Sequence, residues 1–67
     1  MRVILYSTGC PRCNVLKKKL QSKGIVYEEV NDVEVMEKKG FVTVPILDVE
    51  GLDLMNFTEA VEWINGR

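Results

Sequence analysis

Only two cysteines occur in this chain of 67 residues, and Cys10 and Cys13 stand three positions apart. Domains this small often need disulfides or a structural metal, but a disulfide that closes so short a loop removes little entropy from the unfolded chain. No histidine is present to complete a zinc site with these sulfurs. The chain must therefore fold around an apolar core, for which 46% hydrophobic and 28% charged residues are a globular balance.

Charge, hydrophobicity and composition exclude several classes of partner, location and enzyme. Nine basic and ten acidic residues give a net charge of -1, so nothing favours nucleic acid or an acidic membrane as the main partner. No apolar run approaches the roughly 20 residues of a membrane span, and Met1-Arg2-Val3-Ile4-Leu5-Tyr6 is too short for a signal-peptide core with a cleavage site. The absence of histidine excludes Ser-His and Cys-His hydrolases. We expect one cytoplasmic domain over residues 1–67, acting as a monomer on a protein or a small molecule.

The first half of the chain predicts a strand, a helix and a second strand. Residues 3–6 form a short, β-rich apolar run, which is typical of a central strand buried on both faces. Pro11 suits the first turn of a helix that continues to Gly24, and apolar residues recur within it at Val15, Leu16 and Leu20. Residues 25–30 are β-branched and aromatic, and the intervening helix makes this strand parallel to the first. The pattern predicts a βαβ unit.

Two further helices are predicted from their capping residues. Asn31-Asp32 can cap a short helix, for which Gly40 is the left-handed stop. Asn56 and Glu59 have the spacing of a capping box, which predicts an amphipathic helix that ends at Gly66.

A hairpin is predicted between these two helices. Residues 43–47 and 52–54 are apolar segments that flank the turn-like pair Glu50-Gly51, and Pro45 stands at the entry to the first of the two strands. The complete order is then βαβαββα. This order predicts an α/β fold in which three helices flank a four-stranded mixed sheet.

The segment Cys10-Pro11-Arg12-Cys13 lies at a strand-to-helix junction inside the βαβ unit, which is the setting of a thioredoxin-like redox motif. At a helix N-terminus, unpaired backbone N–H groups and the helix dipole favour a thiolate on Cys10, and Arg12 adds positive charge. Cys10 is therefore predicted to be the nucleophile. Cys13, one turn further on and more buried, is predicted to resolve the mixed disulfide formed on Cys10.

Other roles for the two cysteines stay open at this point. They can be ordinary small core residues, or they can supply half of a zinc site. A zinc site within one chain would lack its other ligands, because no further cysteine and no histidine exist. We therefore expect no metal site within a single chain, and a cluster that bridges two chains remains as an alternative.

Two segments carry a resemblance to a known family. The runs Tyr6-Ser7-Thr8-Gly9-Cys10-Pro11-Arg12-Cys13 and Thr43-Val44-Pro45 resemble a glutaredoxin, including the small glutaredoxin-like proteins that reduce ribonucleotide reductase. The resemblance covers nearly the whole chain and implies a thioredoxin fold. It also implies that the Val44-Pro45 bond is cis, that Pro45 faces the cysteines, and that Val44 offers backbone hydrogen bonds to a bound thiol peptide. The substrate contacts expected on this basis are Pro11, Arg12, Thr43, Val44, Pro45, Asn56 and Phe57.

The start of the last helix leaves the electron donor open. Many glutaredoxins hold the γ-glutamyl end of glutathione with a Gly-Gly or Gly-Cys pair followed by acidic residues, where this chain has Leu54-Met55-Asn56-Phe57-Thr58. The thioredoxin reductase-dependent donors of ribonucleotide reductase carry Trp-Ser-Gly-Phe near this point, and only Phe57 matches. We expect Phe57 or Met55 to flank the cysteine groove, and Trp63 to pack in the core.

Two groups of lysines also stand out. Lys17-Lys18-Lys19 and Lys38-Lys39 are interpreted first as solvated helix faces. Lys38 or Lys39 also stands where a basic residue of the family reaches a ligand carboxylate beside Val44.

The residues and the resemblance together predict a thiol-disulfide oxidoreductase that reduces protein or glutathione mixed disulfides through Cys10 and Cys13. No tightly bound cofactor is expected; glutathione or thioredoxin reductase would restore the dithiol, and the target would be a disulfide-containing protein such as ribonucleotide reductase. The alternative is a glutathione-dependent carrier in which Cys10 thiolates of two chains bridge an iron-sulfur cluster. A thioredoxin-fold adaptor without redox activity is disfavoured, because it needs neither the cysteines nor Pro45.

Overall fold

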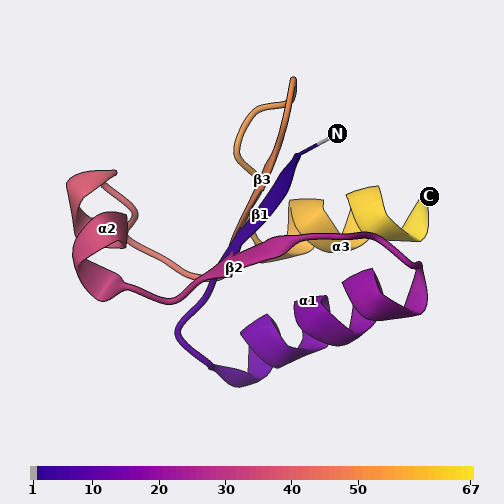
Figure 1. Ribbon diagram of the computed structural model, residues 1–67, viewed down its shortest axis with the longest axis horizontal. Coiled ribbons are helices and arrows are strands. Elements are labelled where there is room, and N and C mark those ends of the chain that lie inside the picture. The colour runs from indigo at the N-terminus through magenta and orange to yellow at the C-terminus, as the bar shows by residue number, and fades with distance from the viewer. Residues whose placement is uncertain (1) are drawn as a thin grey trace.

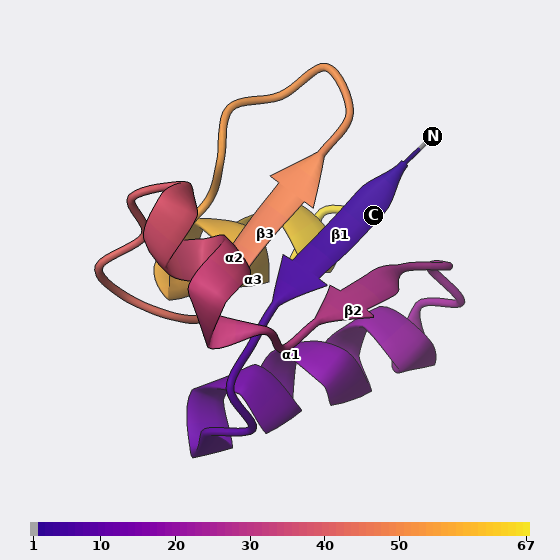
Figure 2. The same cartoon turned by 60° about the vertical axis from the view of Figure 1, so that its left-hand side comes forward.

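The computed structural model describes residues 2–67, so residue 1 of the predicted domain lies outside the described residues. Its elements are, in order, β1 (Val3–Tyr6), α1 (Pro11–Ser22), β2 (Glu28–Val30), α2 (Val33–Lys38), β3 (Ile46–Val49) and α3 (Phe57–Asn65). The three strands form one mixed sheet in the order β2-β1-β3, in which β1 is parallel to β2 and antiparallel to β3 (Figure 2). The predicted central strand and the parallel βαβ unit are therefore confirmed.

The sheet is covered on both faces, which explains why all four residues of β1 are buried. Val3 and Leu5 belong to the larger core cluster, which α1 and α3 complete. Ile4 and Tyr6 point to the other face, where α2 contributes Met36. Figure 1 shows α1 and α3 together on one side of the strands and α2 on the other. The alternation of side chains along β1 thus divides the interior into two parts.

Local capping accounts for the position of the helices. Pro11 is the first residue of α1, where its missing N–H costs no hydrogen bond. Asp32 caps α2 by accepting a hydrogen bond of 3.0 Å from the backbone of Glu34. Asn56 and Glu59 form the predicted capping box at the start of α3. Each predicted helix start is therefore present in the structure.

The predicted fourth strand is wrong. Instead of a second hairpin strand over residues 52–54, a single antiparallel bridge joins Leu47 to Met55, with both backbone hydrogen bonds at 2.9 Å. On one side of this bridge the chain turns away, because the Leu52 N–H bonds to the Val49 carbonyl at 2.9 Å. On the other side of the bridge, Pro45 lies two residues before Leu47 and has no N–H to continue the pairing. The sheet therefore has three strands.

Two apolar residues lie elsewhere than predicted. Val15 is 41% exposed, whereas Leu16 and Leu20 of the same helix are fully buried. Met55, which was expected beside the cysteine groove, is 9% exposed and belongs to the larger core cluster. Trp63 is partly buried and packs against that core as expected. Among residues 2–67, no helix has both the length and the apolar character needed to cross a membrane.

Candidate active site

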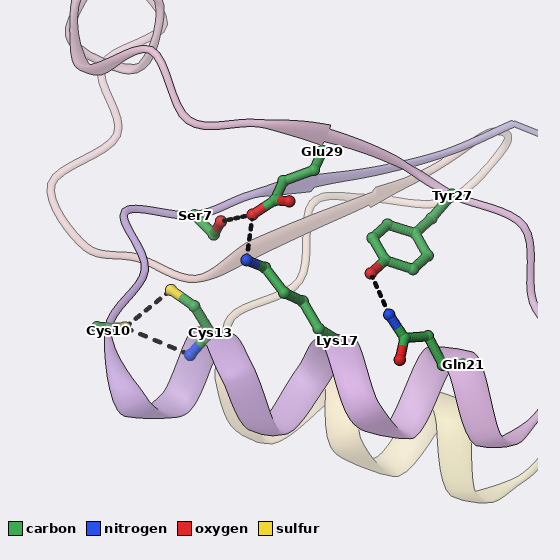
Figure 3. A network of polar contacts seen from close by, with 7 residues as sticks. All are labelled: Ser7, Cys10, Cys13, Lys17, Gln21, Tyr27 and Glu29. Carbon is green, nitrogen blue, oxygen red and sulfur yellow. Dashed lines mark hydrogen bonds and ion pairs between the residues drawn. The ribbon is translucent and has the colours of Figure 1, made fainter.

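Cys10 and Cys13 lie together at the start of α1, just beyond the C-terminal end of the central strand (Figure 3). Cys10 is the N-cap residue, and its sulfur accepts a hydrogen bond of 3.3 Å from the Cys13 backbone N–H. The two sulfurs are 2.8 Å apart and both are free thiols. Cys10 is partly exposed, whereas Cys13 is fully buried. An incoming disulfide can therefore reach Cys10 but not Cys13.

The surroundings shift the pKa values of the two thiols in opposite directions. The Cys13 side chain and then the Cys13 backbone N–H, both hydrogen-bonded to the Cys10 sulfur, lower the pKa of Cys10. Burial, followed by the hydrogen bond to Cys10, raises the pKa of Cys13. The Cys13 S–H therefore donates to a Cys10 thiolate, which suits a nucleophile beside a thiol held in reserve.

We expect Cys10 to be alkylated by iodoacetamide at pH 7 at least about ten times faster than Cys13, because it is both more accessible and more ionised. Peptide mapping by mass spectrometry after timed quenching measures the two rates. In 8 M urea, the same comparison is the control, since unfolded thiols share a pKa of about 8.5 and should react alike. Equal labelling of the native protein would contradict the assignment of roles.

Six of the seven residues expected to contact substrate line one shallow depression of about 180 Å³. It is lined by Arg12, Thr43, Val44, Pro45, Asn56, Phe57 and Thr58. Pro11, the seventh, is exposed on the first turn of α1 and does not line it. Thr58 was missed, although its place beside Phe57 on the first turn of α3 was a usable signal. Small-molecule pockets usually measure about 300–1,000 Å³, so this depression is too small to enclose such a ligand.

The walls of this depression come from segments far apart in the sequence. The Arg12 guanidinium lies 5.4 Å from the centre of the Phe57 ring, which joins the first turn of α1 to the first turn of α3. The Val44-Pro45 peptide bond is cis, as the resemblance predicts, and Pro45 is fully buried while Thr43 is exposed. The loop before β3 thus forms the third wall.

A second depression, of about 200 Å³, lies on the other side of the loop before β3 and shares Thr43 and Val44 with the first. Its remaining lining residues are Thr8, Val33, Met36, Glu37, Phe41 and Val42. Val33 and Val42 are 52% and 95% exposed and give this depression an apolar border. Two larger hollows border Arg2 and Glu50, and no cysteine lines either of them.

A polar cluster beside the cysteines was missed in the sequence (Figure 3). The Ser7 hydroxyl donates to Glu29 Oε2 at 2.7 Å, and the Lys17 ammonium lies 2.5 Å from the same oxygen. Glu29 raises the pKa of Lys17, whereas Lys17 and then Ser7 lower the pKa of Glu29. Lys17 is therefore not a freely solvated residue, in contrast to the prediction for its lysine run. Lys39, from the other run, lies over the Tyr6 ring at 5.8 Å.

No family model matches the chain, and no curated protein sequence matches it. Among solved structures, it is similar to the glutaredoxin-like protein NrdH-redoxin from Escherichia coli, which is described with a thioredoxin-like activity profile. The two share 22% sequence identity and superpose with a TM-score of 0.77 over 98% of this chain and 93% of that protein. The thioredoxin-like α/β fold is thereby confirmed, although the sheet has three strands instead of the four expected.

Proposed function

We propose that the protein is a glutaredoxin-like thiol-disulfide oxidoreductase that reduces disulfides of other proteins through Cys10 and Cys13. The Cys10 thiolate attacks one sulfur of the substrate disulfide, so that a mixed disulfide forms and the other substrate sulfur leaves as a thiolate. Cys13 then loses its proton and attacks Cys10, which releases the second substrate thiol. The substrate gains two electrons and two protons, and the protein is left with a Cys10–Cys13 disulfide.

One observation supports this proposal above the others: the two adjacent thiols have opposite environments. The accessible one has a lowered pKa and the buried one a raised pKa. A pair of merely structural core cysteines has no need for an exposed member at a helix N-terminus. The environment of Cys10 therefore suits attack on a substrate disulfide, and that of Cys13 suits the later resolution.

The loop before β3 suggests an extended peptide as the substrate. Within residues 2–67, the Val44 N–H and C=O form no backbone hydrogen bond, so a bound chain can pair with them. The depressions on either side of Val44 are open rather than enclosing, and the second is bordered by exposed valines. These features favour an extended segment with apolar side chains on either side of its cysteine.

We further propose that thioredoxin reductase, rather than glutathione, restores the dithiol. The first turn of α3 begins at Asn56 and Phe57, without the glycine pair that would hold a glutathione backbone closely. The similar Escherichia coli protein is described as having a thioredoxin-like activity profile. By the same resemblance, ribonucleotide reductase is the target we would test first.

Two coupled assays test the proposal and the choice of reductant. NADPH consumption is followed with an oxidised disulfide peptide and thioredoxin reductase in one arm, and with the same peptide, glutathione and glutathione reductase in the other, each after subtraction of the rate measured without the protein. We expect turnover in the first arm at least about ten times faster than in the second. Turnover only with glutathione would contradict the proposed reductant, and no turnover in either arm would contradict the proposed function.

A further inference from the structure

The polar cluster of Ser7, Lys17 and Glu29 lies on the side of α1 that faces the sheet. Glu29 is paired with Leu5 in the parallel register, so its side chain points to the face that α1 covers. Ser7 comes directly after β1, points to the same face as Leu5 and is fully buried. The Lys17 and Glu29 side chains are 26% and 31% exposed, so the ion pair is partly shielded from solvent.

Lys17 also stands close to the resolving cysteine. It follows Cys13 by four residues on α1, so the two side chains are neighbours on the same face of the helix, as Figure 3 shows. Glu29 is the largest cause of the raised pKa of Lys17, and a thiolate on Cys13 adds a smaller contribution. An ammonium four residues away on the same helix face favours the thiolate form of Cys13, although burial and the hydrogen bond to Cys10 keep the pKa of Cys13 raised.

The resolving step needs a positive charge that stabilises the Cys13 thiolate. Cys13 can attack the mixed disulfide only as a thiolate, yet burial raises its pKa. Cys13 interacts with Cys10, the N-cap residue of α1, and Lys17 interacts with Cys13, with Glu29 on β2 and with Tyr27 just before β2. The α3 residues that pack in the same core, Ala60 and Ile64, are uncharged. Lys17 is therefore the one cation in this set.

We propose that Lys17, held in place by Glu29, assists resolution by stabilising the negative charge on Cys13 as this residue attacks the mixed disulfide. The inference rests on the proposed function. In the step itself, the Cys13–Cys10 bond forms, the Cys10–substrate bond breaks, and the Cys13 proton ends on the departing thiol. Glu29 acts as the anchor that fixes Lys17 and not as the base, because its two donors keep it ionised.

The experiment separates attack from resolution within one reaction. Reduced protein is mixed with one equivalent of dithiobis(2-nitrobenzoate), and coloured thionitrobenzoate is released first by Cys10 attack and then by Cys13 resolution. Lys17→Met should slow the second phase about three- to tenfold at pH 7, since without the cation a smaller fraction of Cys13 is thiolate. The first phase should not change. At a pH above the pKa of Cys13 in both the wild type and Lys17→Met, their second phases should have the same rate.

Three matched variants complete the test. Lys17→Arg retains the charge and should resolve as fast as the wild type, and Lys18→Met, on an exposed neighbour, should have no effect. Glu29→Gln removes the possible base but keeps a side-chain oxygen that can accept from Lys17 and Ser7, so Lys17 stays in place and resolution should be no slower than in the wild type. If Lys17→Met does not fold, as judged by circular dichroism, Lys17→Gln takes its place.

The outcomes distinguish the inference from the proposed function. A wild-type protein without a second phase would contradict the proposed function itself. Two wild-type phases with an unchanged pH profile in Lys17→Met would overturn only the role of Lys17, and would leave the ion pair as a link between α1 and β2. A Glu29→Gln variant slowed as much as Lys17→Met would also overturn it, because Glu29 would then be the base.

Discussion

Cys10→Ser is expected to lose all measurable disulfide reduction, whereas Cys13→Ser is expected to perform the first attack and then stop. A serine hydroxyl does not ionise near neutral pH and forms no disulfide, so without Cys10 no mixed disulfide can form. Without Cys13, the mixed disulfide has no internal thiol to resolve it and accumulates. The two variants should therefore fail at different steps.

Intact-mass spectrometry after incubation with a disulfide peptide measures this difference. Cys13→Ser should gain the mass of one peptide chain, which dithiothreitol removes, and Cys10→Ser should remain unmodified. The double variant is the control for adventitious adducts. An adduct on Cys10→Ser but not on Cys13→Ser would exchange the roles of the two residues.

Leu5→Ala is expected to lower the free energy of unfolding by about 3 to 5 kcal/mol. Leu5 is fully buried at the centre of β1, and buried Leu→Ala changes of this kind cost about 2.7 to 5.0 kcal/mol. At roughly 0.05 to 0.15 kcal/mol per residue, a chain of 67 residues has only about 3 to 10 kcal/mol in total. The variant should therefore be partly or wholly unfolded at room temperature.

Urea unfolding followed by circular dichroism measures this loss of stability. Val26→Ala is the matched control, because Val26 is 88% exposed and its truncation should change stability by less than about 0.5 kcal/mol. A Leu5→Ala variant with an unchanged urea midpoint would show that the core does not depend on the central strand as the burial indicates.

The parts of the fold that were predicted correctly are those that neighbouring residues determine. Asn56 and Glu59 form their capping box within one helical turn, and Gly40, after α2, has the positive φ of 79° that its place as a helix stop implies. The cysteine pair was found because its spacing and its position after an apolar strand are both visible in the sequence. Most of the expected substrate contacts came from the resemblance rather than from local physics.

The errors arose where distant segments decide the structure. The apolar run at residues 52–54 has the composition of a strand, but its pairing depends on the Val49–Leu52 turn and on Pro45, which leave only the Leu47–Met55 bridge. The Lys17–Glu29 pair likewise depends on which face of the sheet the second of two adjacent glutamates occupies. That face follows from the parallel register of β2 with β1, which no local pattern specifies.

The loop after β3 lies at the end of the sheet remote from the cysteines. Val49 is paired with Val3, the first residue of β1, whereas Cys10 follows the other end of that strand. Figure 2 shows the loop at the top and the start of α1 at the lower left. Lengthening an exposed loop adds little closure entropy, so a peptide tag or a fluorescent domain spliced in after Leu52 would project away from the reactive end. Complexes trapped on Cys10 could then be captured or imaged through that handle while the surface that meets the partner stays untouched.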